Sequence, residues 1–89
     1  MIIKGIKKIA GETKGLEGFY SPCYLQLNYD VSTGEAWTNG LFSVGHNDFV
    51  RYKDENILRV CFMYEKTTMK ELREKIEQAV SESGIIPLV

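Results

Sequence analysis

The sequence predicts an α+β fold: a mainly antiparallel β-sheet of four to five short strands with one C-terminal amphipathic helix packed on one face. Residues 23–31 alternate between apolar and polar side chains, and this period of two is typical of a strand with one buried face. Residues 68–83 carry apolar side chains at spacings of three and four, which is typical of an amphipathic helix. Because the strand patterns precede the helix pattern, we expect the helix to cover one side of the sheet.

Length and composition predict one small domain over residues 1–89. The chain has 89 residues, of which 44% are hydrophobic and 26% are charged, and this supply suits one modest core. Residues 1–10 fit either a strand or a helix, and their β-branched side chains and Gly5 favour the strand. The glycine-rich stretch Gly11–Pro22 is expected to form a loop.

A β-hairpin is expected around residues 23–38. Residues 23–31 form its first strand, in which the odd-numbered side chains share one face. Asp30 can accept hydrogen bonds from the backbone that follows it, and Gly34 can adopt a positive φ, so a turn is predicted between them. Residues 35–38 then return as the partner strand.

Further strands are expected in the middle of the chain. The dipeptide Asn39-Gly40 is a strong turn signal, and it predicts that a new strand begins at residues 41–44. A short strand is expected at residues 49–52. Residues 57–64 carry apolar side chains on both faces, which predicts a central strand.

The C-terminal helix has signals at both ends. Thr68 and Glu71 have the spacing of a capping box, and Gly84 is suited to the end of the helix. Glu71 and Lys75 are four residues apart and are expected to form an ion pair. Residues 85–89 are apolar and contain a proline, so they are expected to pack as an edge strand or along the helix.

Charge and targeting signals narrow the classes of partner. The formal net charge is -1, which argues against a nonspecific nucleic-acid binder. Lysines concentrate near the N-terminus, where they are expected to guard an edge strand, with phosphate contact as the weaker alternative. No apolar run is long enough for a membrane span, and no secretory signal is visible. Cys23 and Cys61 are read as buried free thiols, with a Cys23–Cys61 bridge as the alternative. Together with the missing signals, the free thiols predict a cytoplasmic protein.

The sequence offers no recognisable catalytic or metal-binding motif. His46 is the only histidine, and zinc ligands at paired spacings are missing. No cofactor is therefore predicted, and an enzymatic function ranks last.

The most suggestive candidate site is aromatic. Tyrosine and tryptophan are enriched at the energetic centres of protein interfaces, although several rings are also needed to close the core of so small a domain. The candidate binding residues are Phe19, Tyr20, Tyr24, Trp37 and Phe42.

These patterns predict a small non-enzymatic binding protein that acts through protein–protein interaction. The alternative is an oligomeric module that binds and sequesters a small ligand or nucleotide, with Lys14 and Gly15 in its site. In size, slight acidity and lack of catalytic motifs, the chain is similar to the inhibitors of host defence that phages and mobile elements encode, such as anti-CRISPR proteins. This likeness is one of class and carries no site residues across. It implies a stoichiometric inhibitor that blocks a surface or sequesters a small signal; a bacterial accessory protein has the same profile.

Overall fold

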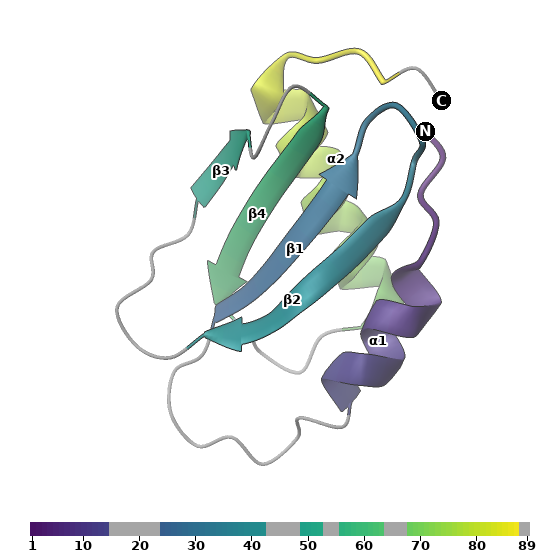
Figure 1. Ribbon diagram of the computed structural model, residues 1–89, viewed down its shortest axis with the longest axis vertical. Coiled ribbons are helices and arrows are strands. Elements are labelled where there is room, and N and C mark those ends of the chain that lie inside the picture. Colours follow the sequence, from purple (N-terminus) through teal and green to yellow (C-terminus); the bar gives the residue numbers. More distant parts are fainter. Residues whose placement is uncertain (15–23, 43–48, 53–55, 64–67, 88–89) are drawn as a thin grey trace.

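The computed structural model describes residues 1–14, 24–42, 49–52, 56–63 and 68–87 (Figure 1). Three seven-residue strands and one four-residue strand form an antiparallel sheet in the order β2-β1-β4-β3. The elements follow one another as α1 (Ile6–Lys14), β1 (Tyr24–Asp30), β2 (Ala36–Phe42), β3 (Phe49–Tyr52), β4 (Ile57–Met63) and α2 (Met69–Ser83). The predicted α+β class is therefore confirmed.

The N-terminal segment contains a helix, so the predictions of a strand over residues 1–10 and of a single, C-terminal helix were wrong. Ile6 and Ile9 lie three residues apart on α1 and are both buried in the core, whereas Lys7 and Lys8 between them are exposed. This burial outweighs the strand preference of the isoleucines. The first four residues of the predicted glycine-rich loop, residues 11–14, belong to α1, so the loop prediction was wrong there. The remainder of that loop, residues 15–22, lies outside the described residues.

The predicted hairpin between β1 and β2 is confirmed. The carboxylate of Asp30 accepts hydrogen bonds from the backbone N–H of Ser32 at 2.9 Å and from its hydroxyl at 2.6 Å. Gly34 has a φ of 77° and donates its N–H to the carbonyl oxygen of Asp30 at 2.8 Å. The turn therefore satisfies its own polar groups before the chain returns as β2.

Asn39 and Gly40 do not form the predicted turn but lie inside β2, at a β-bulge. Gln26 pairs with Gly40 and Leu27 with Thr38, so Asn39 is the extra residue. The hydroxyl of Thr38 donates to the carbonyl oxygen of Gln26 at 2.8 Å and accepts from the N–H of Gly40 at 3.0 Å. Gly40 has a φ of 98°, so the same backbone freedom that suits a turn here serves a bulge. Residues 36–42 form one strand instead of two.

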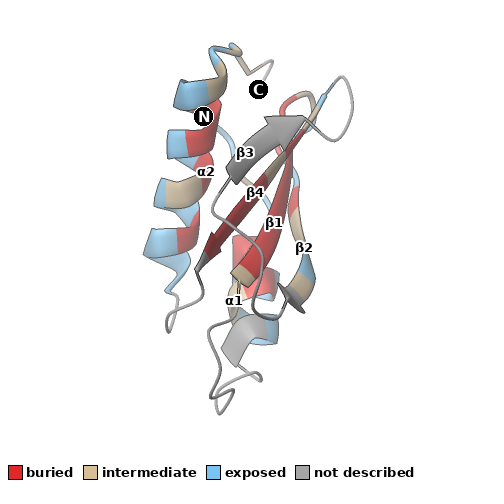
Figure 2. Ribbon diagram, turned by 90° about the vertical axis from the view of Figure 1, so that its left-hand side faces the viewer, coloured by how far each residue is buried: buried red, intermediate tan, exposed pale blue. Residues whose placement is uncertain are grey.

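The hydrophobic core lies between the sheet and the two helices. Alternate residues of β1 and β4 point to this side and are buried, as are Ile6 and Ile9 of α1. Both helices pack on this one face (Figure 2), where α2 turns its buried residues toward the strands. The core members from the strands and α2 are Leu25, Leu27, Tyr29, Ala36, Leu58, Val60, Phe62, Leu72, Ile76, Ala79 and Val80.

The C-terminal helix begins and ends as predicted. The hydroxyl of Thr68 accepts from the N–H of Glu71 at 3.2 Å, and Gly84 has a φ of 73° and bonds back to the helix. Lys75 is not paired with Glu71 as predicted; its ammonium group lies 5.3 Å from the centre of the Phe62 ring. Through this contact, the side chain of Lys75 covers the ring of Phe62 at the edge of the core.

The segment after α2 is not the predicted edge strand where it is described. Ile85 packs against the core, as expected for a tail that runs along the helix, whereas Ile86 is 86% exposed.

Candidate functional site

The side of the sheet opposite the helices, here called the helix-free face, carries the first candidate site. Trp37 of β2, Asn28 of β1 and Arg59 of β4 are direct cross-strand partners, so they form one row across three strands. Trp37 and Arg59 are partly exposed, and Asn28 between them is fully buried. The row therefore presents an indole and a guanidinium on a rigid backbone.

The position of Arg59 is fixed by two amides of β1. Its Nε donates to the amide oxygen of Asn28 at 3.4 Å. The amide oxygen of Gln26, in the orientation that satisfies both groups, accepts from the guanidinium nitrogens of Arg59, two of them at 3.3 Å. Charge-assisted bonds of this kind hold a long side chain in one conformation, which lowers the entropy that a partner must remove on binding.

Polar side chains of β1 are buried on the helix-free face, although the sequence predicts that this side of residues 23–31 faces solvent. Gln26 is 8% exposed and Asn28 is 0% exposed. The amide nitrogen of Asn28 has no hydrogen-bond partner within the part of the chain that the structure describes. Central strands are shielded by their neighbours on both sides, which explains why alternation alone did not reveal this burial.

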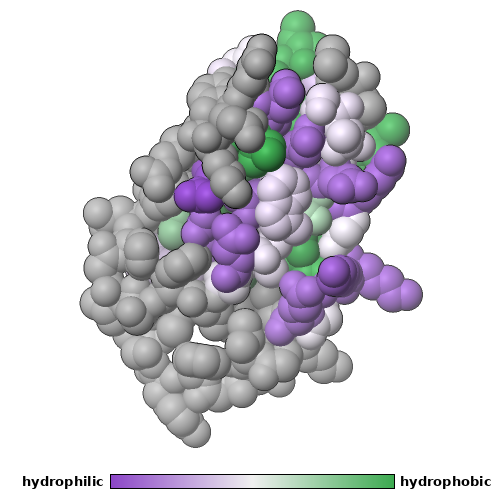
Figure 3. Space-filling view, viewed as in Figure 1, coloured by the Kyte–Doolittle hydropathy of each residue, from purple (hydrophilic) through white to green (hydrophobic). Residues whose placement is uncertain are grey.

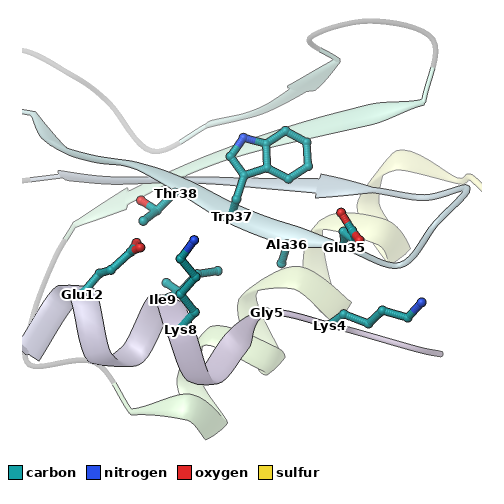
Figure 4. A pocket seen from close by; sticks show the side chains of 9 residues that line it. All are labelled: Lys4, Gly5, Lys8, Ile9, Glu12, Glu35, Ala36, Trp37 and Thr38. Carbon is teal, nitrogen blue, oxygen red and sulfur yellow. The ribbon is translucent and has the colours of Figure 1, made fainter.

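A groove of about 470 Å³ between α1 and the outer edge of β2 forms the second candidate site. It is called the edge groove below. In Figure 4, the side chains of Lys8 and Glu12 rise from α1 toward β2, while the indole of Trp37 projects on the other side of that strand. The edge groove is lined by Lys4, Gly5, Lys8, Ile9, Glu12, Glu35, Ala36, Trp37 and Thr38.

The charges of the edge groove balance. Lys4 and Lys8 supply two positive groups, and Glu12 and Glu35 supply two negative ones. Among the described side chains, ion pairs occur on α2, and none of these four residues takes part in them. Figure 3 shows that hydrophilic residues dominate the described surface of the helix-free face and the adjoining edge. The edge groove is thus lined by charges of both signs that form no ion pair with any side chain the structure describes.

The structure brings two of the predicted binding residues to one face. Tyr24 and Trp37 both lie on the helix-free face and are partly exposed, and Phe42 occupies the register position opposite Tyr24. Phe19 and Tyr20 lie outside the described residues.

Of the predicted nucleotide-binding pair, Lys14 is the last residue of α1, and Gly15 lies outside the described residues. Sequence reasoning missed Arg59, since one arginine in an apolar strand gives no local signal; the polar residues opposite it in the sheet become visible only through strand pairing.

Other features of the described residues are few. Cys61 is buried, as predicted, whereas Cys23 and His46 lie outside the described ranges. Within those ranges, no group of three acidic, histidine or cysteine side chains is placed to hold a metal ion. No helix among them is long and apolar enough to cross a membrane. The chain matches no protein-family model, no curated protein and no solved structure with which it was compared.

Proposed function

We propose that this protein is a small non-enzymatic binding protein that recognises a protein partner through its helix-free face. The row formed by Trp37, Asn28 and Arg59 carries this proposal, because it places two partly exposed anchors on the two strands that flank β1. Tryptophan, tyrosine and arginine are the residue types that contribute most to binding energy at protein interfaces. Tyr24 adds the third type on the same face.

The rigidity of the anchors also supports this function. Trp37 lies in β2 beside a hairpin turn whose polar groups are satisfied, and Arg59 is held by Asn28 and Gln26. A preorganised surface binds with a small entropic cost, which suits a protein that acts stoichiometrically by covering a surface of its target. An inhibitor of a host defence system is one form that such a protein can take.

The alternative, nucleotide sequestration, receives less support from the described residues. The edge groove has a volume within the range of small-ligand sites, but its two acids offset its two lysines. Phosphate groups favour sites with an excess of positive charge or converging backbone N–H groups. A thermal-shift screen with nucleotides tests this alternative, since any ligand that binds the folded state raises the melting temperature.

The test of the proposed function is a comparison of partner capture by single-site variants. Wild-type protein is immobilised and exposed to a lysate of the native host, and captured proteins are compared with those held by Trp37→Ala and Arg59→Ala. Lys70→Ala, on the exposed side of α2, is the matched control. We expect a partner that wild type and Lys70→Ala retain and that both anchor variants lose.

The affinity of that partner is then measured with purified proteins. Trp37 is the only tryptophan, so its fluorescence reports directly on contact of wild type and Arg59→Ala with the partner. The Trp37→Ala variant lacks this probe, so its affinity is measured by titration calorimetry. Each anchor substitution is expected to cost about 2 kcal/mol, which is roughly a thirtyfold loss of affinity. Circular dichroism and urea unfolding show whether the variants remain folded. A partner that folded anchor variants bind as tightly as wild type does would refute the proposed role of this face.

A further inference from the structure

The outer edge of β2 already accepts one residue from outside the sheet. The N–H of Lys4 donates to the carbonyl oxygen of Gly34 at 2.7 Å, and the N–H of Ala36 donates to the carbonyl oxygen of Lys4 at 2.8 Å. Gly5, with a φ of 89°, then turns the chain away into α1. Within the described residues, Lys4 alone pairs with this edge. The N-terminal segment therefore shows that this edge can form hydrogen bonds with an extended chain. Lys4 pairs with the edge only at Glu35, directly before β2 begins.

Beyond Ala36 the same edge runs along the edge groove. Hydrogen-bonding groups of an edge strand point outward at every second residue, and the N–H of Ala36 points outward to Lys4. From this alternation we infer that the backbone N–H and C=O of Thr38, the last residue before the bulge, point to the same side. The hydroxyl of Thr38 is engaged within the sheet, where it bonds Gln26 and Gly40. The backbone of Thr38 thus offers a donor and an acceptor to a chain lying in the groove.

Two charged side chains of α1, Lys8 and Glu12, line the edge groove next to Thr38, and their spacing matches that of an extended chain. Lys8 and Glu12 are one helical turn apart, which is about 6 Å along the helix axis. Two residues of an extended chain advance about 6.6 Å, and their side chains lie on the same side. A basic and an acidic residue two positions apart in an extended peptide therefore match Glu12 and Lys8 together.

We propose that the outer edge of β2 binds an extended peptide by strand addition. The bridge of Lys4 to this edge is parallel, whereas a longer added strand takes the more stable antiparallel direction, in which a basic residue comes two positions before an acidic one. Gly5 lies against Ala36, so Lys8 is nearer the start of β2 and Glu12 nearer Thr38 (Figure 4). An antiparallel peptide consequently meets Glu12 first and Lys8 second. The nine residues of α1 extend about 13.5 Å, the length of roughly four extended residues.

This site is distinct from the surface assigned to the proposed function. The side chains of the helix-free face project from one side of the sheet, whereas the peptide would bond the backbone at its border. Strand addition takes affinity from main-chain hydrogen bonds and specificity from alternate side chains, and both elements are present here. The alternative is that Lys8 and Glu12 merely shield the edge from association.

The test uses an acetylated and amidated pentapeptide of the order threonine-lysine-threonine-aspartate-threonine. Binding is followed by the amide NMR signals of ¹⁵N-labelled protein at millimolar peptide. We expect a saturable shift of the Thr38 amide. A peptide with lysine and aspartate exchanged should bind about tenfold more weakly, because two attractive pairs become repulsive. A peptide methylated on the nitrogen of its central threonine should not bind, because it cannot complete the main-chain bonds.

The double variant Lys8→Glu/Glu12→Lys provides the decisive comparison. Both side chains are exposed, so the variant is expected to fold, and its preference between the two charge orders should be reversed. Arg59→Ala, on the helix-free face, should bind the peptide as wild type does. The inference is overturned if Thr38 does not shift, if the methylated peptide binds equally well, or if the double variant keeps the wild-type preference. Shifts of Thr38 with ATP but not with peptide would likewise overturn it.

Discussion

Substitution of Gly5 by alanine tests how strongly the N-terminal segment is fixed to the sheet. Gly5 has a φ of 89°, and a Cβ at this position would overlap the carbonyl oxygen of Ala36. Gly84 also has a positive φ, of 73°, but among the described residues no atom beyond its chain neighbours lies within 4 Å of the place where its Cβ would be. Gly11, inside α1, has open space and no positive φ. Alanine substitutions at these three glycines therefore separate the energetic cost of backbone strain from the cost of steric overlap.

The expected costs follow from these differences. An L-residue in the left-handed region costs about 1–2 kcal/mol, and Gly84→Ala should lose this amount alone. Gly5→Ala loses the same amount and must also shift the backbone of Lys4, which weakens two hydrogen bonds worth about 1 kcal/mol each. The total is about 3–4 kcal/mol. Gly11→Ala should instead gain about 1 kcal/mol, since alanine is the better helix former.

Urea unfolding monitored by Trp37 fluorescence measures all three variants under the same conditions. The free energy of unfolding should decrease in the order Gly11→Ala, wild type, Gly84→Ala, Gly5→Ala, with similar dependence on urea concentration. If Gly5→Ala is no less stable than Gly84→Ala, the close approach of the N-terminal segment to Ala36 is wrong. The bond between Lys4 and the edge of β2 would then also lose its support.

Three further predictions concern side chains that form hydrogen bonds with the backbone or with a neighbouring side chain. Thr68→Ala should lower the free energy of unfolding by about 1 kcal/mol, and an unchanged urea midpoint would contradict the capping role of its hydroxyl. The Tyr29 hydroxyl donates to the carbonyl oxygen of Ile2 at 2.8 Å, so Tyr29→Phe should cost about 1 kcal/mol. Burial and the nearby Asp30 raise the pKa of Tyr29 above 10, so wild type should lose stability as the pH rises beyond 10, and Tyr29→Phe should lose less. Hydrogen bonds from Ser32 lower the pKa of Asp30. The ionised carboxylate therefore stabilises the folded protein above about pH 4, and this stabilisation should be lost on acidification. The free energy of unfolding of Asp30→Asn, measured over the same pH range, should lack that loss.

Structural features that depend on residues close together in the sequence were predicted correctly. The turn at Asp30–Gly34 and the ends of α2 depend on residues within a few positions of one another, and the structure contains both. Asn39-Gly40 also showed where the backbone needs a positive φ. Its local signal does not distinguish a turn from a bulge, because that choice depends on pairing with Gln26 in another strand.

Features that depend on distant partners were not predictable. Ile6 and Ile9 are strong strand formers, and only the apolar surface of the sheet and α2 makes a helix the better arrangement for them. The candidate site has the same character. Trp37 was identified by its type, but its neighbours Asn28 and Arg59 come from strands 9 and 22 residues away along the chain and meet it through the register of the sheet.

The order of the strands has a consequence for synthesis on the ribosome. β1 is bonded on one side by β2, which follows it immediately, and on the other by β4, whose last residue, Met63, comes 21 residues after the end of β2 at Phe42. At roughly 5–20 residues per second, translation of that stretch takes about one to four seconds. Throughout this interval, the edge of β1 that later pairs with β4 has no hydrogen-bonding partner in a nascent β1–β2 hairpin. The apolar side chains of Leu25 and Leu27 lie on this same strand. The growing chain is then most exposed to chaperones and to wrong partners, and this window closes only when β4 emerges.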